Sequence, residues 1–153
     1  MALIAVGAIA SGKAVQAGDA QAIVAQHMVG EALLAAHLVA IAEKAGMSAD
    51  EINAILKDVA QKSAIDEFWI TDENGRAYLT NEDFEFTFVA DPEKEPQAAA
   101  FWPLLTGEKD VVIQEARKRD ADDRVFKYVG VAGVDKPRIV QVGVSADHLP
   151  GNP

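Results

Sequence analysis

Residues 125–144, VFKYVGVAGVDKPRIVQVGV, hold two runs rich in valine and isoleucine on either side of a short polar turn. The runs Val125 to Ala132 and Arg138 to Val144 are typical of strands, because β-branched residues favour an extended backbone. The turn from Gly133 to Pro137 is short, as it is between antiparallel neighbours. A third run, Val111 to Lys118, precedes them after another short polar turn. Together the three runs predict an antiparallel meander.

A further pair of strands is predicted on the N-terminal side of the meander. Phe68 to Thr71 and Arg76 to Thr80 form a β-hairpin pattern, with Asn74-Gly75 supplying the positive φ angles of the turn. Residues 81–109, called the connector below, contain many aromatic residues and prolines. We expect the connector to be irregular, with a short helix near Gln97 to Leu105. The predicted sheet therefore has five strands.

The first part of the chain is predicted to be helical. Residues 20–45 are dominated by alanine, leucine, valine and isoleucine and contain no proline. Asp19 is a candidate N-cap for this helix, and Gly46 is a candidate stop. The string Ser48-Ala-Asp-Glu51 is a capping-box pattern, which predicts a second helix that runs to about Ser63.

The first predicted helix is apolar around most of its circumference. Its narrow polar strip holds Gln26, His27, Glu31, His37 and Lys44. Such a helix must be covered on several sides, so we expect the rest of the chain on one side and a second copy of the protein on another. The same polar residues interrupt the longest apolar run, so the pattern indicates no membrane span, and membrane contact is expected only through flanking spans of a longer protein.

Composition limits the domain organisation and the class of partner. The chain has 153 residues, no cysteine and a net charge of −10. Thiol chemistry is therefore excluded, and we expect no nucleic-acid partner, because binding a phosphate backbone needs an excess of Lys and Arg. All ten aromatic residues lie after residue 64, in the half that also carries a charge of −8. We expect a helical segment, residues 1–64, packed with a β-containing domain, residues 65–147, and a tail, residues 148–153.

Three strings sharpen this description into a resemblance. They are AIDEFWITDENG at residues 64–75, FWPLL at residues 101–105 and FKYVGVAGVDKPRIVQVG at residues 126–143. Together with the order of elements, they resemble Cache domains, the PAS-like extracytoplasmic sensor domains of bacterial chemoreceptors and sensor kinases. The resemblance covers roughly the whole chain. It implies an α+β fold with a PAS-like five-stranded antiparallel sheet, a long N-terminal helix, a second helix and a mixed connector.

The resemblance also implies a role in signal transduction or chemotaxis. In that family the sheet separates the long helix, here the signalling and dimerisation segment, from a small-molecule pocket formed with the connector. We expect the ligand to be a small organic acid or a similar metabolite. The location is periplasmic if the chain is the sensor module of a receptor, and a cytoplasmic location is left open.

Two basic residues are candidates to bind such a ligand. Lys127 is the only polar member of an otherwise apolar row on one strand face. Burying an ammonium group without a partner is costly, so Lys127 is expected to pair with Glu67 or Glu115, to reach the surface, or to bind a ligand anion. Arg117, at the end of the preceding strand, can clamp a carboxylate with two hydrogen bonds.

Aromatic residues are the candidates for the pocket walls, because ligand sites combine aromatic lining with a few polar groups. For each of them, ordinary core packing is the alternative. Arg119 and Arg124 lie at a turn, where we expect them to be solvated. The aromatic candidates are Trp69, Tyr78, Phe101, Trp102 and Tyr128.

No catalytic, metal or cofactor site is predicted. His27 and Glu31 share a helical face, but His37 does not converge on them. The string Gly7 to Lys13 fits a phosphate-binding loop, yet the residue that follows it, Ala14, lacks the hydroxyl that would hold magnesium. We therefore expect a non-enzymatic ligand-binding sensor domain. The alternative is a dimerisation or interaction module whose PAS-like sheet holds no small molecule.

Overall fold

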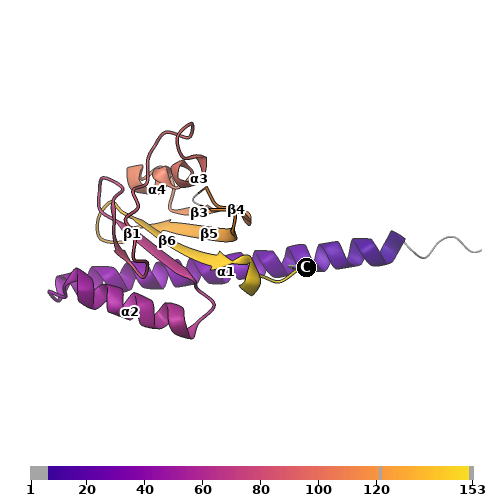
Figure 1. Cartoon of the computed structure of the whole chain (residues 1–153), viewed down its shortest axis with the longest axis horizontal. Helices are drawn as coiled ribbons and strands as arrows, with labels where there is room; N and C mark the ends of the chain where they lie inside the picture. Colours follow the sequence, from indigo (N-terminus) through magenta and orange to yellow (C-terminus); the bar gives the residue numbers. More distant parts are fainter. Residues whose placement is uncertain (1–6, 121, 152–153) are drawn as a thin grey trace, which may run out of the picture.

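The computed structural model describes residues 7–120 and 122–151. It is an α+β structure of three layers, with two helices on one face of an antiparallel sheet and the connector on the other (Figure 1). The predicted fold class is therefore confirmed, and both faces of the sheet are covered. The helices are α1 (Gly7–Lys44), α2 (Ala49–Lys62), α3 (Pro96–Ala99) and α4 (Trp102–Thr106).

The sheet has six strands in the order β2-β1-β6-β5-β3, and β4 also pairs with β5. The sixth strand arises because the predicted run from Val111 to Lys118 is interrupted. At the interruption, Gln114 donates its side-chain amide to the Gln97 carbonyl oxygen at 2.9 Å, which ties this edge to the connector. The strands are β1 (Glu67–Thr71), β2 (Ala77–Thr80), β3 (Val111–Ile113), β4 (Arg117–Lys118), β5 (Val125–Ala132) and β6 (Ile139–Ser145).

The helix boundaries confirm most of the predicted end signals. Gly46 ends α1 with a φ angle of 83°, and the capping box of Ser48 and Glu51 begins α2. The predicted start was wrong, because α1 continues through Asp19.

In the turn between β1 and β2, only Gly75 has a positive φ angle. The Asp72 carboxylate accepts hydrogen bonds from the backbone N–H groups of Asn74 and Arg76 and so holds the loop.

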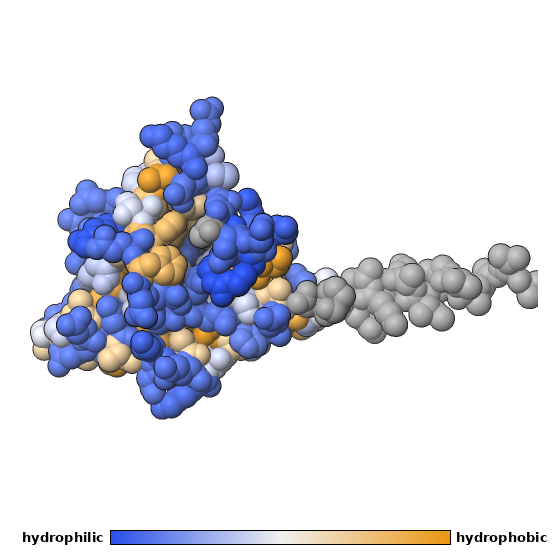
Figure 2. Space-filling view, viewed as in Figure 1, coloured by the Kyte–Doolittle hydropathy of each residue, from blue (hydrophilic) through white to orange (hydrophobic). Residues whose placement is uncertain are grey.

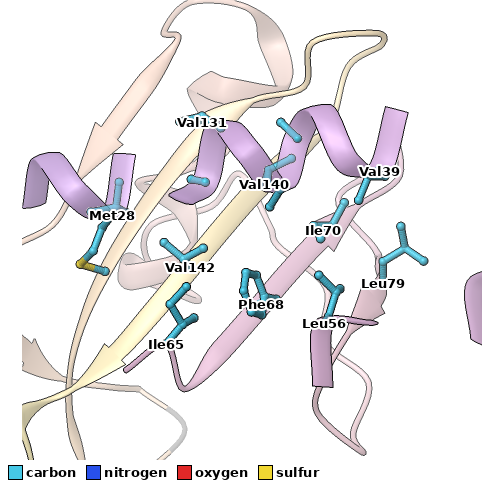
Figure 3. Close-up of a cluster of buried hydrophobic side chains, with 14 of the residues drawn as sticks. Met28, Val39, Leu56, Ile65, Phe68, Ile70, Leu79, Val131, Val140 and Val142 are labelled. Carbon is cyan, nitrogen blue, oxygen red and sulfur yellow. The ribbon is translucent and has the colours of Figure 1, made fainter. Parts of the chain in front are cut away.

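The larger core lies between α1 and the sheet. Small residues on α1, among them Ala32 and Ala36, let the helix approach the strands closely. Figure 3 shows side chains of α1, α2 and the strands meeting in this layer. The core includes Met28, Val39, Leu56, Ile65, Phe68, Ile70, Leu79, Val131, Val140 and Val142.

The described part of the predicted tail, residues 148–151, contacts the domain. A short 3₁₀ helix covers Ala146–His148, and Leu149 is buried in the larger core. His148 Nδ1 lies 3.1 Å from Asp66 Oδ2, which is close enough for an ion pair when the imidazole is protonated. Leu149 is held in the larger core by the apolar surface that it packs against.

Helix α1 continues well past the edge of the sheet (Figure 1). Its segment Gly18–Lys44 is long and apolar enough to cross a membrane by length and composition, and a third of its most apolar window is buried against the domain. Core helices of globular domains pass the same test, so the location of the chain stays a prediction.

A second core lies on the opposite face of the sheet, under the connector. The ring of Phe101 is fully buried there, and it packs where Gly130 leaves room: a Cβ atom at residue 130 would come within 2.7 Å of that ring. Leu104 closes over the same glycine. This glycine lets the connector lie directly on β5 and positions the pocket described next.

Candidate functional site

A pocket of about 420 Å³ opens between the sheet and the connector. Figure 2 shows apolar surface between hydrophilic residues in the region where the connector faces the sheet. The volume lies in the range of small-molecule sites. The pocket is lined by Glu67, Trp69, Phe84, Glu85, Phe86, Phe88, Lys94, Glu95, Gln97, Ala98, Arg119, Asp120, Tyr128 and Gln141.

The floor of the pocket is organised around Glu67, whose carboxylate is 3 % exposed. Trp69 Nε1 and the Tyr128 hydroxyl donate to Glu67 Oε2 at 3.0 and 2.8 Å. Arg119 donates to the other carboxylate oxygen, Oε1. Each oxygen of this buried charge therefore has donors, as burial of a carboxylate requires. The network fixes one ring on β1 and another on β5.

Arg119 is held from three sides. Besides Glu67, its guanidinium donates to both carboxylate oxygens of Asp122 at 2.7 and 2.6 Å, and it lies 4.7 Å from the ring centre of Phe126. The hydrogen bonds with Asp122 raise the pKa of Arg119 and hold the pKa of Asp122 below its usual value. The prediction that Arg119 is solvated was wrong, because β4 and the turn fold it back onto the floor of the pocket.

Tyr128 is a donor on this floor. Burial raises the pKa of the Tyr128 phenol, and the charge of Glu67 raises it further, so the hydroxyl keeps its proton. Its ring stacks on Phe126 at a centroid distance of 5.6 Å. The ring also lies directly over Gly143, where a Cβ atom would come within 2.5 Å of Tyr128. Gly143 therefore leaves the space that this ring occupies.

The apolar wall of the pocket consists of rings set at angles to one another. The ring centroid of Trp69 lies 5.1 Å from that of Phe84 and 5.6 Å from that of Phe86, and the ring planes meet at angles of 59° and 56°. Phe86 meets Phe88 edge-on at 5.0 Å. The three phenylalanines alternate along the connector, which is why they reach the same wall.

Gln97 lines the pocket, and its side chain has a buried polar atom that no described residue pairs with. Its side chain is 8 % exposed, and its Nε2 atom has no hydrogen-bond partner among the residues that the structure describes. The rest of the residue is well anchored: its backbone N–H donates to Asp120 Oδ2 and its Oε1 accepts the Asp120 N–H, both at 3.1 Å. A buried amide without an acceptor costs free energy that a ligand oxygen would recover.

Of the predicted wall residues, the structure brings Trp69 and Tyr128 together at the pocket. Phe101 is completely buried in the core beside the pocket, and its ring centroid lies 6.3 Å from that of Phe88. Trp102 is half-buried and packs on the β1–β2 turn, where a Cβ atom at Gly75 would come within 2.9 Å of its ring. Phe101 and Trp102 therefore support the connector without lining the pocket.

The predicted cations do not converge on the pocket. Adjacent side chains on a strand point to opposite faces of the sheet. Because Tyr128 points into the pocket, its neighbour Lys127 points to the face that α1 covers. Its Nζ donates to the Gln114 carbonyl oxygen at 3.0 Å and lies 3.7 Å from Glu115 Oε2, which are the internal partners that a buried ammonium needs. Arg117 is exposed, with an ion pair to Asp120 at 3.2 Å.

Tyr78 belongs to a different polar cluster, which ties α1 to the β5–β6 turn. The completely buried Arg138 donates to the Tyr78 hydroxyl at 2.9 Å, to Glu43 at 2.7 Å and to Asp135 at 3.0 Å. Burial alone would raise the pKa of Glu43, but the hydrogen bonds from Arg138 and Tyr78 and the charges of Arg138 and Lys136 outweigh it and hold that pKa below its ordinary value.

Sequence reasoning missed most of the polar lining. Glu67 begins a strand whose pattern is otherwise apolar, and a charged residue on a buried strand was the available signal. Gln97 and Asp120 lie in irregular segments, where no periodicity indicates which way a side chain points. Among the described residues, no group of three or more His, Asp or Glu side chains is placed to hold a metal ion.

Neither the models of known protein families nor the curated proteins contain a match to this chain.

Proposed function

We propose that this chain is a ligand-binding sensory domain of the kind found in bacterial chemoreceptors and sensor kinases, and that its ligand occupies the connector pocket. The observation that carries the proposal is the buried Gln97 amide without an acceptor in a pocket of about 420 Å³. Among the described residues, the lining contains no Ser, Thr or His, and so offers no hydroxyl nucleophile with a neighbouring imidazole base. We therefore propose binding without chemical conversion.

The layout of the sheet supports a route for a signal. Tyr128 and Gln141 line the pocket from β5 and β6. The opposite faces of these strands carry Val129 and Val140, which pack in the core formed with α1. A ligand that favours one placement of the strands then favours one placement of the helix. The Glu43–Arg138 pair joins the same helix to the turn between the two strands.

We also propose that a second copy covers the outward face of α1. Leu34 and Ile41 on this face are 72 % and 67 % exposed, and Ile23 is 60 % exposed. The exposed residues of this face form a stripe along α1, opposite the buried alanines, that consists of Ile23, His27, Gly30, Leu34, His37 and Ile41. Successive members are alternately four and three residues apart, which is the spacing of the contact face in packed pairs of helices, so a second copy of α1 can pack against it.

A thermal-shift screen of the purified chain tests the ligand-binding proposal. The panel contains carboxylates, amines, amino acids and neutral polar compounds. A ligand at 100 times its Kd adds about 2.7 kcal/mol of stability, which raises the Tm of a domain of this size by roughly 5–10 °C. The variant Gln97→Leu should lose most of this shift. A broad panel in which no compound raises the Tm would contradict the proposal and favour the interaction module.

A further inference from the structure

The ionic character of the pocket indicates which charge its ligand carries. Four lining residues are carboxylates, namely Glu67, Glu85, Glu95 and Asp120, whereas two are cations, Lys94 and Arg119. The lining therefore has a formal charge of −2. This balance opposes an anionic ligand unless a buried cation is free to meet it.

Neither cation is available in that way. Arg119 already pairs with Glu67 and Asp122, which together balance more than its single charge. Lys94 has a side chain that is 76 % exposed, and its Nζ lies 3.9 Å from Asp91. An exposed, hydrated ammonium adds little to binding an anion. An organic acid, which the sequence led us to expect, therefore finds no strong partner on these walls.

Two carboxylates of the lining, those of Glu95 and Glu85, are not neutralised by a buried basic side chain. Among the residues that the structure describes, Glu95 has no basic side chain within 4.0 Å. Glu85 meets Arg76 at 3.4 Å, but both side chains are largely exposed. Glu85, like Lys94, is too exposed to add much to the binding of an ion, so the uncompensated charge at the pocket is mainly that of Glu95.

Aromatic faces attract cations through the negative potential of the ring, and tilted rings around one space are a common way to hold an ammonium group. We infer that the pocket takes a small organic ammonium compound that carries a hydrogen-bond acceptor, with its nitrogen against Trp69, Phe84 and Phe86 and its acceptor at Gln97 Nε2. This inference rests on the proposed ligand-binding function and adds the chemical class of the ligand.

Calorimetric titration of the whole chain tests the class. The probes are choline and ethanolamine, which combine an ammonium group with a hydroxyl, 3,3-dimethylbutan-1-ol, which is the neutral isostere of choline, and succinate. We expect at least one ammonium probe to bind, and choline, if it binds, to bind at least about tenfold more tightly than its isostere. Phe86→Leu should weaken ammonium binding at least about fivefold while leaving the weak binding of the isostere unchanged.

A charge-matched pair of variants separates the pocket from the general acidity of the connector. Glu95→Gln should weaken binding of the ammonium probe, whereas Glu93→Gln, the same change at an exposed residue outside the lining, should leave it unchanged. Far-ultraviolet circular dichroism confirms that each variant is folded.

Binding of succinate without binding of either ammonium probe would overturn the inference and leave the proposed function standing, as would equal affinity for choline and its isostere. Binding that Glu93→Gln and Glu95→Gln weaken equally would also overturn it. If none of the four probes binds, the ammonium class is wrong, and the wider thermal-shift panel decides the proposed function separately.

Discussion

Replacing Arg119 with methionine should destabilise the domain strongly, because the change leaves the Glu67 carboxylate buried without its cation. Both side chains are less than 10 % exposed. Loss of one partner of a buried ion pair costs about 3–5 kcal/mol. Glu67 keeps its hydrogen bonds from Trp69 and Tyr128, so we expect the lower end, about 3 kcal/mol.

Urea unfolding followed by circular dichroism measures this loss. With a slope of about 2 kcal/mol per molar urea, a loss of about 3 kcal/mol lowers the unfolding midpoint by about 1.5 M. Arg124→Met is the matched control, since Arg124 is exposed, meets the same Asp122 at 3.0 Å and lies over the same Phe126 ring. Its cost should stay within about 0.5 kcal/mol.

A double-mutant cycle with Glu67→Gln completes the test. The neutral amide still accepts from Trp69 and Tyr128, so adding Glu67→Gln to Arg119→Met should restore about 1–2 kcal/mol. A cost of less than about 1 kcal/mol for Arg119→Met, or a double variant as unstable as the sum of the single ones, would refute a buried ion pair at the floor of the pocket.

Three further perturbations test other parts of the structure. Glu43→Gln should destabilise the domain at pH 7. Because the folded-state pKa of Glu43 is lowered, the stability that the carboxylate contributes to the wild type is lost as the pH falls through that pKa. The difference in unfolding free energy between the two proteins, measured in urea, should therefore shrink below about pH 4.5 and stay constant above it. Gly143→Ala should displace the Tyr128 ring and cost about 1–3 kcal/mol, together with loss of ligand binding, and unchanged binding would show that the ring does not need its place over the glycine. Leu34→Glu should convert a dimer into a monomer in light scattering and remove the dependence of the Tm on protein concentration, and a wild-type chain that is already monomeric would contradict the helix seam.

The sequence indicates the scaffold well, because the scaffold depends on local signals. The capping box at Ser48, the stop at Gly46 and the valine-rich runs of β5 and β6 each act over a few residues, and the structure contains them all. The division of the run 111–118 into two strands was not predictable, since it depends on a contact between Gln114 and the distant connector.

The pocket is harder to predict for a physical reason. Its walls come from β1, β5, β6, the connector and the turn after β4, so residues far apart in the chain must fold before they meet. Strand alternation correctly predicts that Lys127 and Tyr128 point to opposite faces, but it does not say which face holds the pocket. Lys127, the predicted ligand contact, therefore lies on the other face, which packs against α1.

The polar residues of the pocket depend on partners rather than on position. Arg119 follows a strand in a turn, where a solvated side chain is the usual outcome. Its burial becomes favourable only because Glu67 and Asp122 lie within hydrogen-bond distance in the folded chain. A turn residue with two such partners cannot be recognised from the sequence of the turn alone.

The central claim, that the connector pocket binds a small molecule, can be tested most directly by nuclear magnetic resonance. The chain has two tryptophans, of which Trp69 lines the pocket and Trp102 does not. On titrating the strongest binder of the panel, the indole N–H signal of Trp69 and the side-chain amide signals of Gln97 should move and saturate together, while the indole signal of Trp102 stays in place. A compound that binds while the Trp69 and Gln97 signals stay unchanged would contradict the claim.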